Sequence, residues 1–189
     1  MGFTRAELQS FRDATVPDLL GAGLKLLFVG INPGLWTAAT STHFAHPGNR
    51  FYPALLLAGV TDRQIDRGGG MTAADREHLI SRGIGISNIV HRATAKASEL
   101  TTVELRDGSL ELAQLVRLRQ PAVVAVAGIT AYRTAFSRPK ATMGLQPHSF
   151  EGAQLWVVPN PSGLNAHETT ETLAAAYRAP AVAAGVITA

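Results

Sequence analysis

The chain has 189 residues, of which 46% are hydrophobic and 16% are charged, and this composition is typical of a globular domain rather than a disordered or fibrous protein. Its formal net charge of +3 permits a polyanionic partner without requiring one. The absence of cysteine excludes disulfides, iron–sulfur clusters, thiolate zinc sites and a cysteine nucleophile. Because no signal-peptide pattern and no apolar run of about 18 residues occurs, we expect the protein in the cytoplasm and not in a membrane.

Periodicity and turn residues predict a chain of alternating helices and strands. Thr4 and Glu7 have the spacing of a capping box, and Thr72 occupies the position of a helix N-cap. Helices are predicted, in chain order, over residues 5–13, 51–58, 73–82, 101–120, 129–136 and 168–178. Strands are predicted over the apolar runs at residues 24–29, 83–90, 121–128 and 154–160.

This alternation predicts the α/β class, with a single three-layer domain over residues 1–189 and a mostly parallel central sheet flanked by helices. Residues 1–20 are expected to form an N-terminal helical extension, and the apolar tail at 179–189 to fray or to dock. Ligands of such sheets bind at the carboxyl ends of the strands. Three predicted strands end in unusual sequences, which are GINPG at 30–34, AGIT at 127–130 and PNPSGL at 159–164.

Two of these strand ends hold an asparagine next to proline, with glycine close by. They are Asn32, in GINPG, and Asn160, in NPSGLN. Proline and glycine fix the backbone locally, so each amide is expected to point in one direction. An amide is not a base near neutral pH, but it can orient a water molecule or read a hydrogen-bonding edge. The alternative is an ordinary strand-to-helix turn, in which these residue types are common.

The polar stretch TSTHFAHPGNR adds an aromatic ring and two possible anion contacts. Phe44 could stack on a base, or it could belong to a small hydrophobic cluster. His43 and His46 are three residues apart, but they have no cysteine or carboxylate partner nearby, so they do not predict a metal site. Asn49 and Arg50 precede a helix, where a phosphate could be held. Arg50 is alternatively a solvated surface charge.

Several other catalytic patterns do not occur in the sequence. The strand-end loops hold no lysine at phosphate-loop spacing, no GxGxxG and no carboxylate, and Ser162 has no evident histidine partner. The expected site is therefore polar and neutral, which suits stabilising a leaving anion better than attack by a strong nucleophile. Leu164, which follows Gly163 in a polar turn, either packs against the body of the protein or enters a base stack as a wedge.

Three motifs together carry a resemblance to a known family. They are GINPGLWTAATSTHFAHPGNRFYPALLLAGVT, NIVHRAT and VVPNPSGLNA, in that order. The chain resembles the mismatch-specific uracil DNA glycosylases, the branch of the uracil DNA glycosylase superfamily that includes thymine-DNA glycosylase. The resemblance extends from about Leu24 to Arg178. The absence of cysteine favours this branch over the related thermophile-type enzymes, which hold an iron–sulfur cluster.

The resemblance implies two catalytic residues and a pocket for the base. Asn32 would position the hydrolytic water at C1′ of the flipped nucleotide, and Asn160 would hold that nucleotide or a neighbouring phosphate. Phe44 would stack on uracil, while backbone N–H groups near Ile31 and Phe44 would bind its carbonyl oxygens. Gly34, in the same motif as Asn32, is expected to contact the substrate.

The resemblance also implies contacts at the sides of the base and with DNA. Thr37 stands where many relatives have small residues, so Thr37 and His43 are expected to border C5 of the base and reject the methyl group of thymine. Asn88 is expected to be a second polar contact or a strand-end cap. The residues expected to contact DNA are Asn49, Arg50, Ser162, Gly163, Leu164 and Asn165, with Gly163 and Leu164 filling the gap that the flipped nucleotide leaves.

The function implied is that of a monofunctional DNA glycosylase in base excision repair. It would flip uracil, mainly opposite guanine, out of duplex DNA and hydrolyse its N-glycosidic bond. Its expected partner is double-stranded DNA with G·U or related mismatches, and it is expected to act as a monomer without cofactor or metal. Two alternatives stay open. One is a free-nucleoside hydrolase, which would need a carboxylate or a metal, and the other is a non-catalytic module that binds mismatches or damaged bases.

Overall fold

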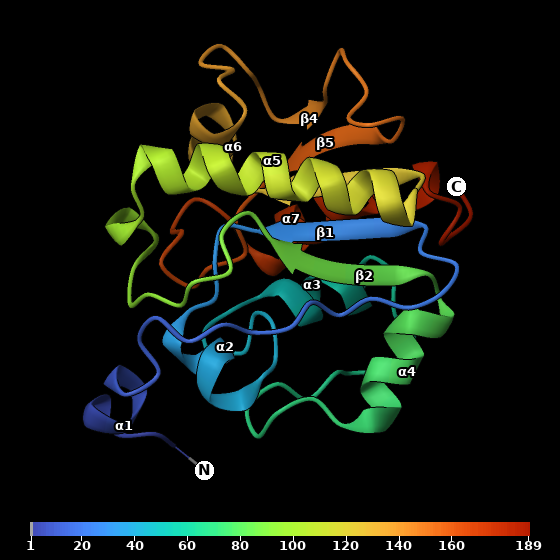
Figure 1. Cartoon of the computed structure of the whole chain (residues 1–189). Helices are drawn as coiled ribbons and strands as arrows, with labels where there is room; N and C mark the ends of the chain where they lie inside the picture. Colours follow the sequence, from blue (N-terminus) through green and yellow to red (C-terminus); the bar gives the residue numbers. More distant parts are fainter. Residues whose placement is uncertain (1) are drawn as a thin grey trace.

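The centre of the molecule is a five-stranded sheet, seen in a computed structural model that describes residues 2–189 (Figure 1). The strand order is β2-β1-β3-β5-β4, and all pairs are parallel except β4 with β5. The strands are β1 (Leu26–Gly30), β2 (Ile84–Asn88), β3 (Val123–Ala127), β4 (Gly144–Leu145) and β5 (Gln154–Val158). The predicted mostly parallel sheet is confirmed. The two-residue edge strand β4 was not predicted, because so short a segment shows no periodicity.

Helices surround this sheet, and four of them begin at a threonine. They are α1 (Arg5–Gln9), α2 (Leu35–Thr40), α3 (Phe51–Leu57), α4 (Ala73–Ser81), α5 (Thr102–Arg119), α6 (Ile129–Ala135) and α7 (Thr170–Ala183), with a short 3₁₀ helix at Ala97–Glu99. The side chains of Thr4, Thr72, Thr101 and Thr169 each accept a hydrogen bond from a backbone N–H in the first turn. Within residues 2–189, no helix has both the length and the apolar character needed to cross a bilayer.

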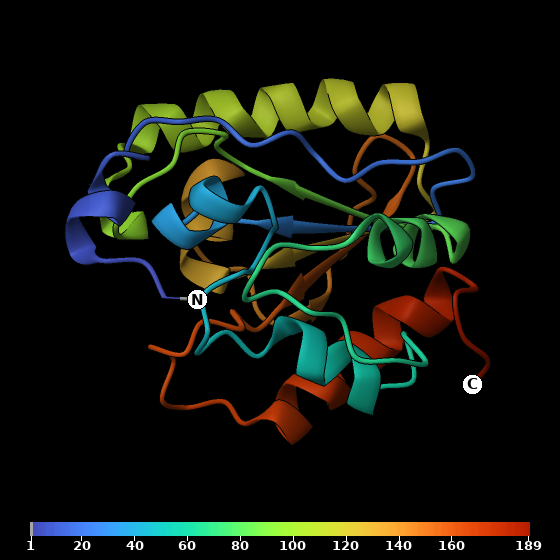
Figure 2. The ribbon, with the colours of Figure 1, turned by 90° about the horizontal axis from the view of Figure 1, so that it is seen from below.

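The sheet is the middle of three layers, as predicted (Figure 2). Strands β1, β2 and β3 are buried on both faces, and alternate side chains point to opposite sides. Leu26 and Phe28 of β1 belong to a core cluster with α3 and α7, whereas Leu27 and Val29 belong to a second cluster with α5 and α6. One hydrophobic core therefore packs on each face of the sheet. The loops that follow the carboxyl ends of the strands lie outside both cores.

The N-terminal end of the chain differs from the prediction, and the C-terminal end follows one of the two predicted alternatives. Helix α1 ends at Gln9 and is followed by turns up to Asp13, where φ is +64°. Thr15 and Leu19 then form isolated bridges with Arg92 and with Ile86 of β2. The N-terminal extension is thus mostly extended rather than helical over residues 1–20. At the other end the predicted tail docks, since α7 continues to Ala183 and the last apolar side chains pack on the core.

Candidate functional site

A pocket of about 910 Å³ lies at the carboxyl ends of the parallel strands, and the two asparagine loops both line it. The strand order explains why they meet, since β3 lies between β1 and β5 and separates the loops by two strand spacings, about 10 Å. Gly128, at the end of β3, has φ of +117°, and a Cβ there would lie 3.4 Å from Cδ1 of Ile31 and 3.8 Å from Cβ of Asn160. Ile31, the neighbour of Asn32 in the chain, and Asn160 thus both approach Gly128, and all three lie next to residues that line the pocket.

The side chain of Asn32 is fixed by hydrogen bonds from its Nδ2. This nitrogen donates to Thr94 Oγ1 at 2.7 Å, to the carbonyl oxygen of Arg92 at 2.9 Å and to that of Pro33 at 3.3 Å. Within residues 2–189, Oδ1 of Asn32 accepts no hydrogen bond, and Asn32 lines the pocket. The amide therefore presents a fixed acceptor to anything that occupies the pocket.

In Asn160 the oxygen of the amide is hydrogen-bonded and the nitrogen is not, the reverse of Asn32. Its Oδ1 accepts a hydrogen bond from the backbone N–H of Ser162 at 3.0 Å, which closes a tight turn. Its backbone carbonyl accepts from Nδ2 of Asn165 at 3.0 Å, so that both ends of the loop are joined. Among the residues that the structure describes, Nδ2 of Asn160 has no acceptor, which leaves a donor on the pocket wall.

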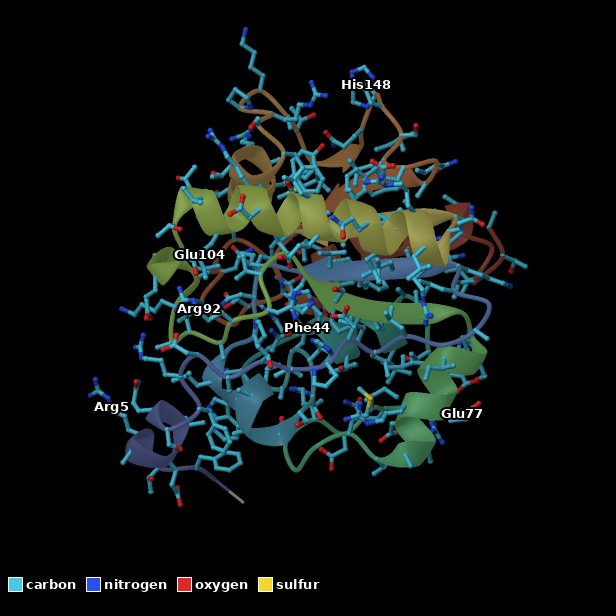
Figure 3. The ribbon with its side chains drawn as sticks, viewed as in Figure 1. Arg5, Phe44, Glu77, Arg92, Glu104 and His148 are labelled. Carbon is cyan, nitrogen blue, oxygen red and sulfur yellow. The ribbon has the colours of Figure 1, made fainter. Side chains whose placement is uncertain are left out.

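The aromatic ring of Phe44, which is labelled in Figure 3, forms one wall of the pocket defined above. Its ring stacks on Phe51 with a centroid distance of 4.1 Å and an interplanar angle of 27°. The backbone of Phe44 has φ of +56°, an uncommon conformation outside glycine. Gly30 makes room for this ring, because a Cβ at residue 30 would lie 3.3 Å from Cζ of Phe44. Phe51 thus supports one face of a ring that can offer a stacking surface.

Three buried polar side chains complete the same side of the pocket. Nε2 of His43 lies 3.1 Å from the carbonyl oxygen of Pro17, and Nδ1 lies 3.2 Å from Nδ2 of Asn88. Burial lowers the pKa of His43 below its ordinary value of 6.5. Thr37, on α2, also lines the pocket and is 5% exposed. The pocket is therefore bordered here by neutral groups of fixed orientation.

The loop after Asn160 ends in an exposed apolar side chain. Leu164 is 90% exposed, so the interpretation that it packs against the body of the protein is wrong. Gly163 packs against the backbone of the neighbouring loop, since a Cβ there would lie 2.6 Å from the carbonyl oxygen of Gly48. The loop is thus packed against the protein at Gly163 and exposed to solvent at Leu164. A side chain that inserts between bases needs this arrangement.

Arg50 has a different position from the one expected. Its Nη2 donates to the carbonyl oxygens of Ser162 at 2.8 Å and Asn165 at 2.7 Å, and its Nη1 donates to that of Glu168. The guanidinium therefore supports the loop that carries Leu164 and is not presented to a phosphate or to solvent. Asn49 is likewise engaged, because its Oδ1 accepts from the backbone N–H of Phe51 at 2.9 Å.

All the other residues that the sequence analysis assigned to the site line this one pocket. They are Ile31, Asn32, Gly34, Thr37, His43, Phe44, Asn49, Asn88, Asn160, Ser162, Gly163, Leu164 and Asn165. The backbone N–H groups of Ile31 and Phe44 make no hydrogen bond to another residue in the range 2–189, so both donors are available to a ligand.

The structure adds residues that the sequence analysis missed. Leu8 of α1 and the segment 94–98 form a further wall. Lys96 is the one lysine, arginine, aspartate or glutamate that lines the pocket within residues 2–189. Glu99, the nearest carboxylate along the chain, accepts from the backbone N–H of Lys96 at 2.8 Å and is paired with Arg12. NIVHRAT was a signal for Thr94, but no sequence pattern marked Lys96 or Leu8.

This wall is joined to the rest of the protein by ion pairs at Arg92. Nε of Arg92 lies 2.8 Å from Glu104 Oε1, beside it in Figure 3, and Nη1 lies 2.7 Å from Asp13 Oδ1. Hydrogen bonds from Arg92 and Thr101 lower the pKa of Glu104 to about 2. Since the carbonyl oxygen of Arg92 accepts from Asn32, these contacts also support the catalytic candidate. No group of three or more histidine, aspartate or glutamate side chains that could hold a metal occurs in residues 2–189.

Comparison with known proteins identifies the family and the fold. The model of the uracil DNA glycosylase superfamily matches residues 17–181. The fold is also similar to the solution structure of a protein from Methanosarcina acetivorans described as a candidate uracil DNA glycosylase, with a TM-score of 0.58 and 18% identity over 88% of this chain and 97% of that one. The family match covers most of the chain, including both asparagine loops, and the chain therefore belongs to the uracil DNA glycosylase superfamily.

Proposed function

We propose that the protein is a monofunctional glycosylase of the mismatch-specific branch, which removes uracil, mainly opposite guanine, from double-stranded DNA. The observation that carries this proposal is the amide of Asn32. Three hydrogen bonds from Nδ2 hold it with Oδ1 free, in a pocket whose lining includes no carboxylate among residues 2–189. Such a group can orient a water molecule but cannot take its proton.

The substrate base must leave the helix before it can react. Flipping costs a few kcal/mol, and less for a mismatched pair, which favours G·U over A·U. A flipped uracil would lie on the ring of Phe44, which Phe51 supports from behind. The free N–H groups of Ile31 and Phe44 would then donate to its carbonyl oxygens. These donors are most useful when the base carries negative charge, so they stabilise the transition state more than the ground state.

The reaction proceeds by departure of the base ahead of full attack by water. The C1′–N1 bond breaks, and its electron pair leaves on uracil, where the charge is shared with O2. Water, oriented by Oδ1 of Asn32, then adds its oxygen to the cationic C1′, and the released proton passes to solvent. Uracil takes up a proton when it departs. Because no carboxylate assists the water, chemistry of this kind is expected to be slow.

The exposed tip of the Asn160 loop would act on the DNA. Leu164 would fill the space that the nucleotide vacates, while Nδ2 of Asn160 would donate to the sugar or a phosphate of that nucleotide. Thr37 would lie beside C5 of the base. Its methyl and hydroxyl groups would leave little room for the methyl group of thymine, so cleavage of G·T should be inefficient.

The test incubates the protein with duplexes that contain G·U, A·U or G·T and then cleaves abasic sites with alkali. We expect strand breaks in the order G·U, A·U, G·T. Free uridine serves as the second substrate, because a nucleoside hydrolase would consume it and a glycosylase of this kind would not. Binding of G·U DNA without strand breaks would contradict the proposal and identify a non-catalytic binding module.

A further inference from the structure

A second pocket, of about 660 Å³, lies beside the edge strand β4. Strand β4 is the outermost strand on the side of the sheet opposite β2, and in Figure 1 its loops lie at the top of the molecule, away from α1 and α2. No residue that lines this pocket also lines the pocket of Asn32 and Asn160. The proposed reaction therefore gives the second pocket no role.

The walls of the second pocket are mainly aromatic. The rings of Tyr132 and Phe136 stack with a centroid distance of 4.6 Å, and the ring of Phe150 meets that of Phe136 edge-on at 5.1 Å. Nε and Nη2 of Arg133 donate to the carbonyl oxygen of Ala141 at 2.9 Å and 2.6 Å, which ties the loop after α6 to that helix. Because the rings already pack on one another, they suit an inserted apolar side chain better than a stacked base.

Two buried side chains in this lining have a polar atom without a partner. Gln146 is 9% exposed, and its Nε2 donates to the carbonyl oxygens of Thr142 at 2.8 Å and Gly144 at 2.9 Å. Within residues 2–189, Oε1 of Gln146 accepts no hydrogen bond, and the hydroxyl of Tyr132, a residue that is 3% exposed, makes none. Neither atom is fully enclosed, so a ligand can reach both. Buried polar atoms normally have a partner, and here a ligand would supply it.

The rim of the second pocket is cationic. Arg138 and Lys140 line it, and neither forms an ion pair with residues 2–189. His148, which is labelled in Figure 3, lies on the loop after β4 and lines the same pocket. No aspartate or glutamate of the described chain is part of this lining. Unpaired cations around an apolar pocket favour a ligand that carries negative charge next to an apolar group.

The outer edge of β4 has no strand beside it within residues 2–189. Strand β4 is antiparallel to β5, with Leu145 opposite Trp156, and the N–H of Gln146 donates to the carbonyl oxygen of Leu155 at 2.8 Å. Because bonded and non-bonded pairs alternate in such a ladder, the N–H and C=O groups of Leu145 point away from β5. The N–H of Met143 makes no hydrogen bond in the same range. An edge of this kind can pair with another strand.

We propose that the second pocket and the edge of β4 bind an extended, acidic segment of another protein. The backbone of that segment pairs with Leu145 as an added strand, and one of its N–H groups donates to Oε1 of Gln146. One apolar side chain enters among the aromatic rings, and neighbouring carboxylates face Arg138 and Lys140. This inference does not depend on the proposed reaction.

A peptide matches these features better than DNA does. Both would be attracted by Arg138 and Lys140, but the sugar–phosphate backbone of DNA has no N–H group to donate to Oε1 of Gln146 or to the carbonyl oxygen of Leu145. A peptide has an N–H donor and a C=O acceptor at almost every residue, in the alternation that the edge of a sheet requires.

The experiment selects binders from a phage-displayed library of short random peptides on the immobilised full-length protein. The enriched sequences are then synthesised, and their affinities are measured by fluorescence anisotropy. We expect an apolar residue next to several acidic residues, and replacement of the acidic residues by asparagine and glutamine should weaken binding about 10-fold or more. Enrichment of no peptide, or of peptides without acidic residues, would overturn the proposal.

A reversed charge on the rim tests the position of the carboxylates. Arg138→Glu should weaken binding of the selected peptide about 3- to 10-fold. Arg106→Glu is the matched control, because Arg106 is also exposed but lies on α5 outside this pocket, and its affinity should equal that of the wild type. Equal affinities of the two variants would overturn the proposal. So would a loss of DNA affinity by Arg138→Glu with peptide affinity unchanged, since the rim would then be a nucleic-acid contact.

Amide hydrogen exchange, followed by NMR in the wild-type protein, locates the bound peptide without any substitution. Saturation with the selected peptide should slow exchange at the N–H of Leu145 about 10-fold or more and leave the unpaired N–H of Phe44, in the first pocket, unchanged. Protection of Phe44 without protection of Leu145 would overturn the proposal, because the acidic peptide would then occupy the candidate DNA site. None of the peptide measurements depends on cleavage, so failure of the proposed function would leave them intact, and their failure would leave G·U cleavage intact.

Discussion

The loops that follow β1 and β5 use the same residue type in opposite ways. Asn32 gives its Nδ2 to three protein oxygens and keeps Oδ1 free, whereas Asn160 gives its Oδ1 to a backbone N–H and keeps Nδ2 free. The first loop is joined to the interior through Thr94 and Arg92. The second loop carries Leu164, 90% exposed, at its tip.

The difference shows that the partners of an amide, and not the residue type, decide what it offers to a ligand. A water molecule that attacks carbon is oriented by an acceptor, which the Asn32 loop supplies. The oxygens of a sugar or a phosphate need a donor, which the Asn160 loop supplies. Removing the free oxygen of Asn32 or the free NH₂ group of Asn160 should therefore impair different steps, and five substitutions in and around the two loops test this comparison.

The largest effect is expected from removal of the acceptor. Asn32→Ala should lower the single-turnover rate on G·U DNA by at least ~100-fold and leave binding nearly unchanged, because water loses its orientation while the DNA contacts remain. Thr94→Val is a second substitution, from which a smaller effect on the same step is expected. It keeps Oδ1 but removes one of the three partners of Nδ2, so a loss of about 3- to 10-fold is expected. Near-normal cleavage by Asn32→Ala would refute the assignment.

Reversing the polarity of the second amide should have the next largest effect. Asn160→Asp keeps the oxygen that accepts from Ser162, so the turn and the thermal stability should survive. It replaces the free donor by an anion, and kcat/KM on G·U DNA should fall about 10- to 100-fold. Full activity of this variant would reduce Asn160 to a turn-forming residue.

Truncation of the Leu164 side chain should lower the affinity for DNA without lowering the stability of the protein. Leu164→Ala should weaken retention on G·U DNA about 5- to 30-fold, because less apolar surface enters the base stack, without a change in thermal unfolding. Leu118→Ala is the matched control, since Leu118 is 79% exposed on α5, outside the pocket lining. Equal affinities of the two variants would make Leu164 a surface residue without a role.

The smallest effect is expected at the single cation beside the Asn32 loop. If Lys96 contacts one phosphate, Lys96→Gln should reduce the slope of log K against log salt concentration by about 0.9. Lys140→Gln, which removes an exposed lysine outside this pocket, should leave the slope unchanged. The measurement is a salt titration of binding to G·U DNA, and identical slopes for the two variants would exclude the contact.

Much of the fold could be predicted because strand burial and helix caps are local signals. The apolar runs gave the four parallel strands, and Thr4 and Thr72 marked helix starts that the structure confirms. Helical spacing, however, does not tell which face of a helix is covered. On α5, Leu110 is 64% exposed, whereas Leu112, two residues further on and therefore on the opposite side of the helix, is buried against the sheet.

Most residues of the site could also be predicted from the sequence. Glycine and proline at the strand ends restrict the backbone, and the carboxyl ends of parallel strands lie at the same edge of the sheet. The direction of the Asn32 amide could not be predicted. Two of its three partners, Arg92 and Thr94, lie 60 and 62 residues away along the chain, so only the folded structure brings them together. The same holds for Arg50, whose carbonyl partners lie more than 100 residues away, and this is why it looked like a free charge.

The contact between Gly163 and Gly48 has a mechanical consequence. Two backbones meet there without side chains between them, and Arg50 ties the same two segments together. The loop that carries Leu164 is therefore in direct contact with the chain just after Phe44. Under the proposed function, insertion of Leu164 into DNA and entry of the base beside Phe44 would therefore involve two segments that contact each other directly.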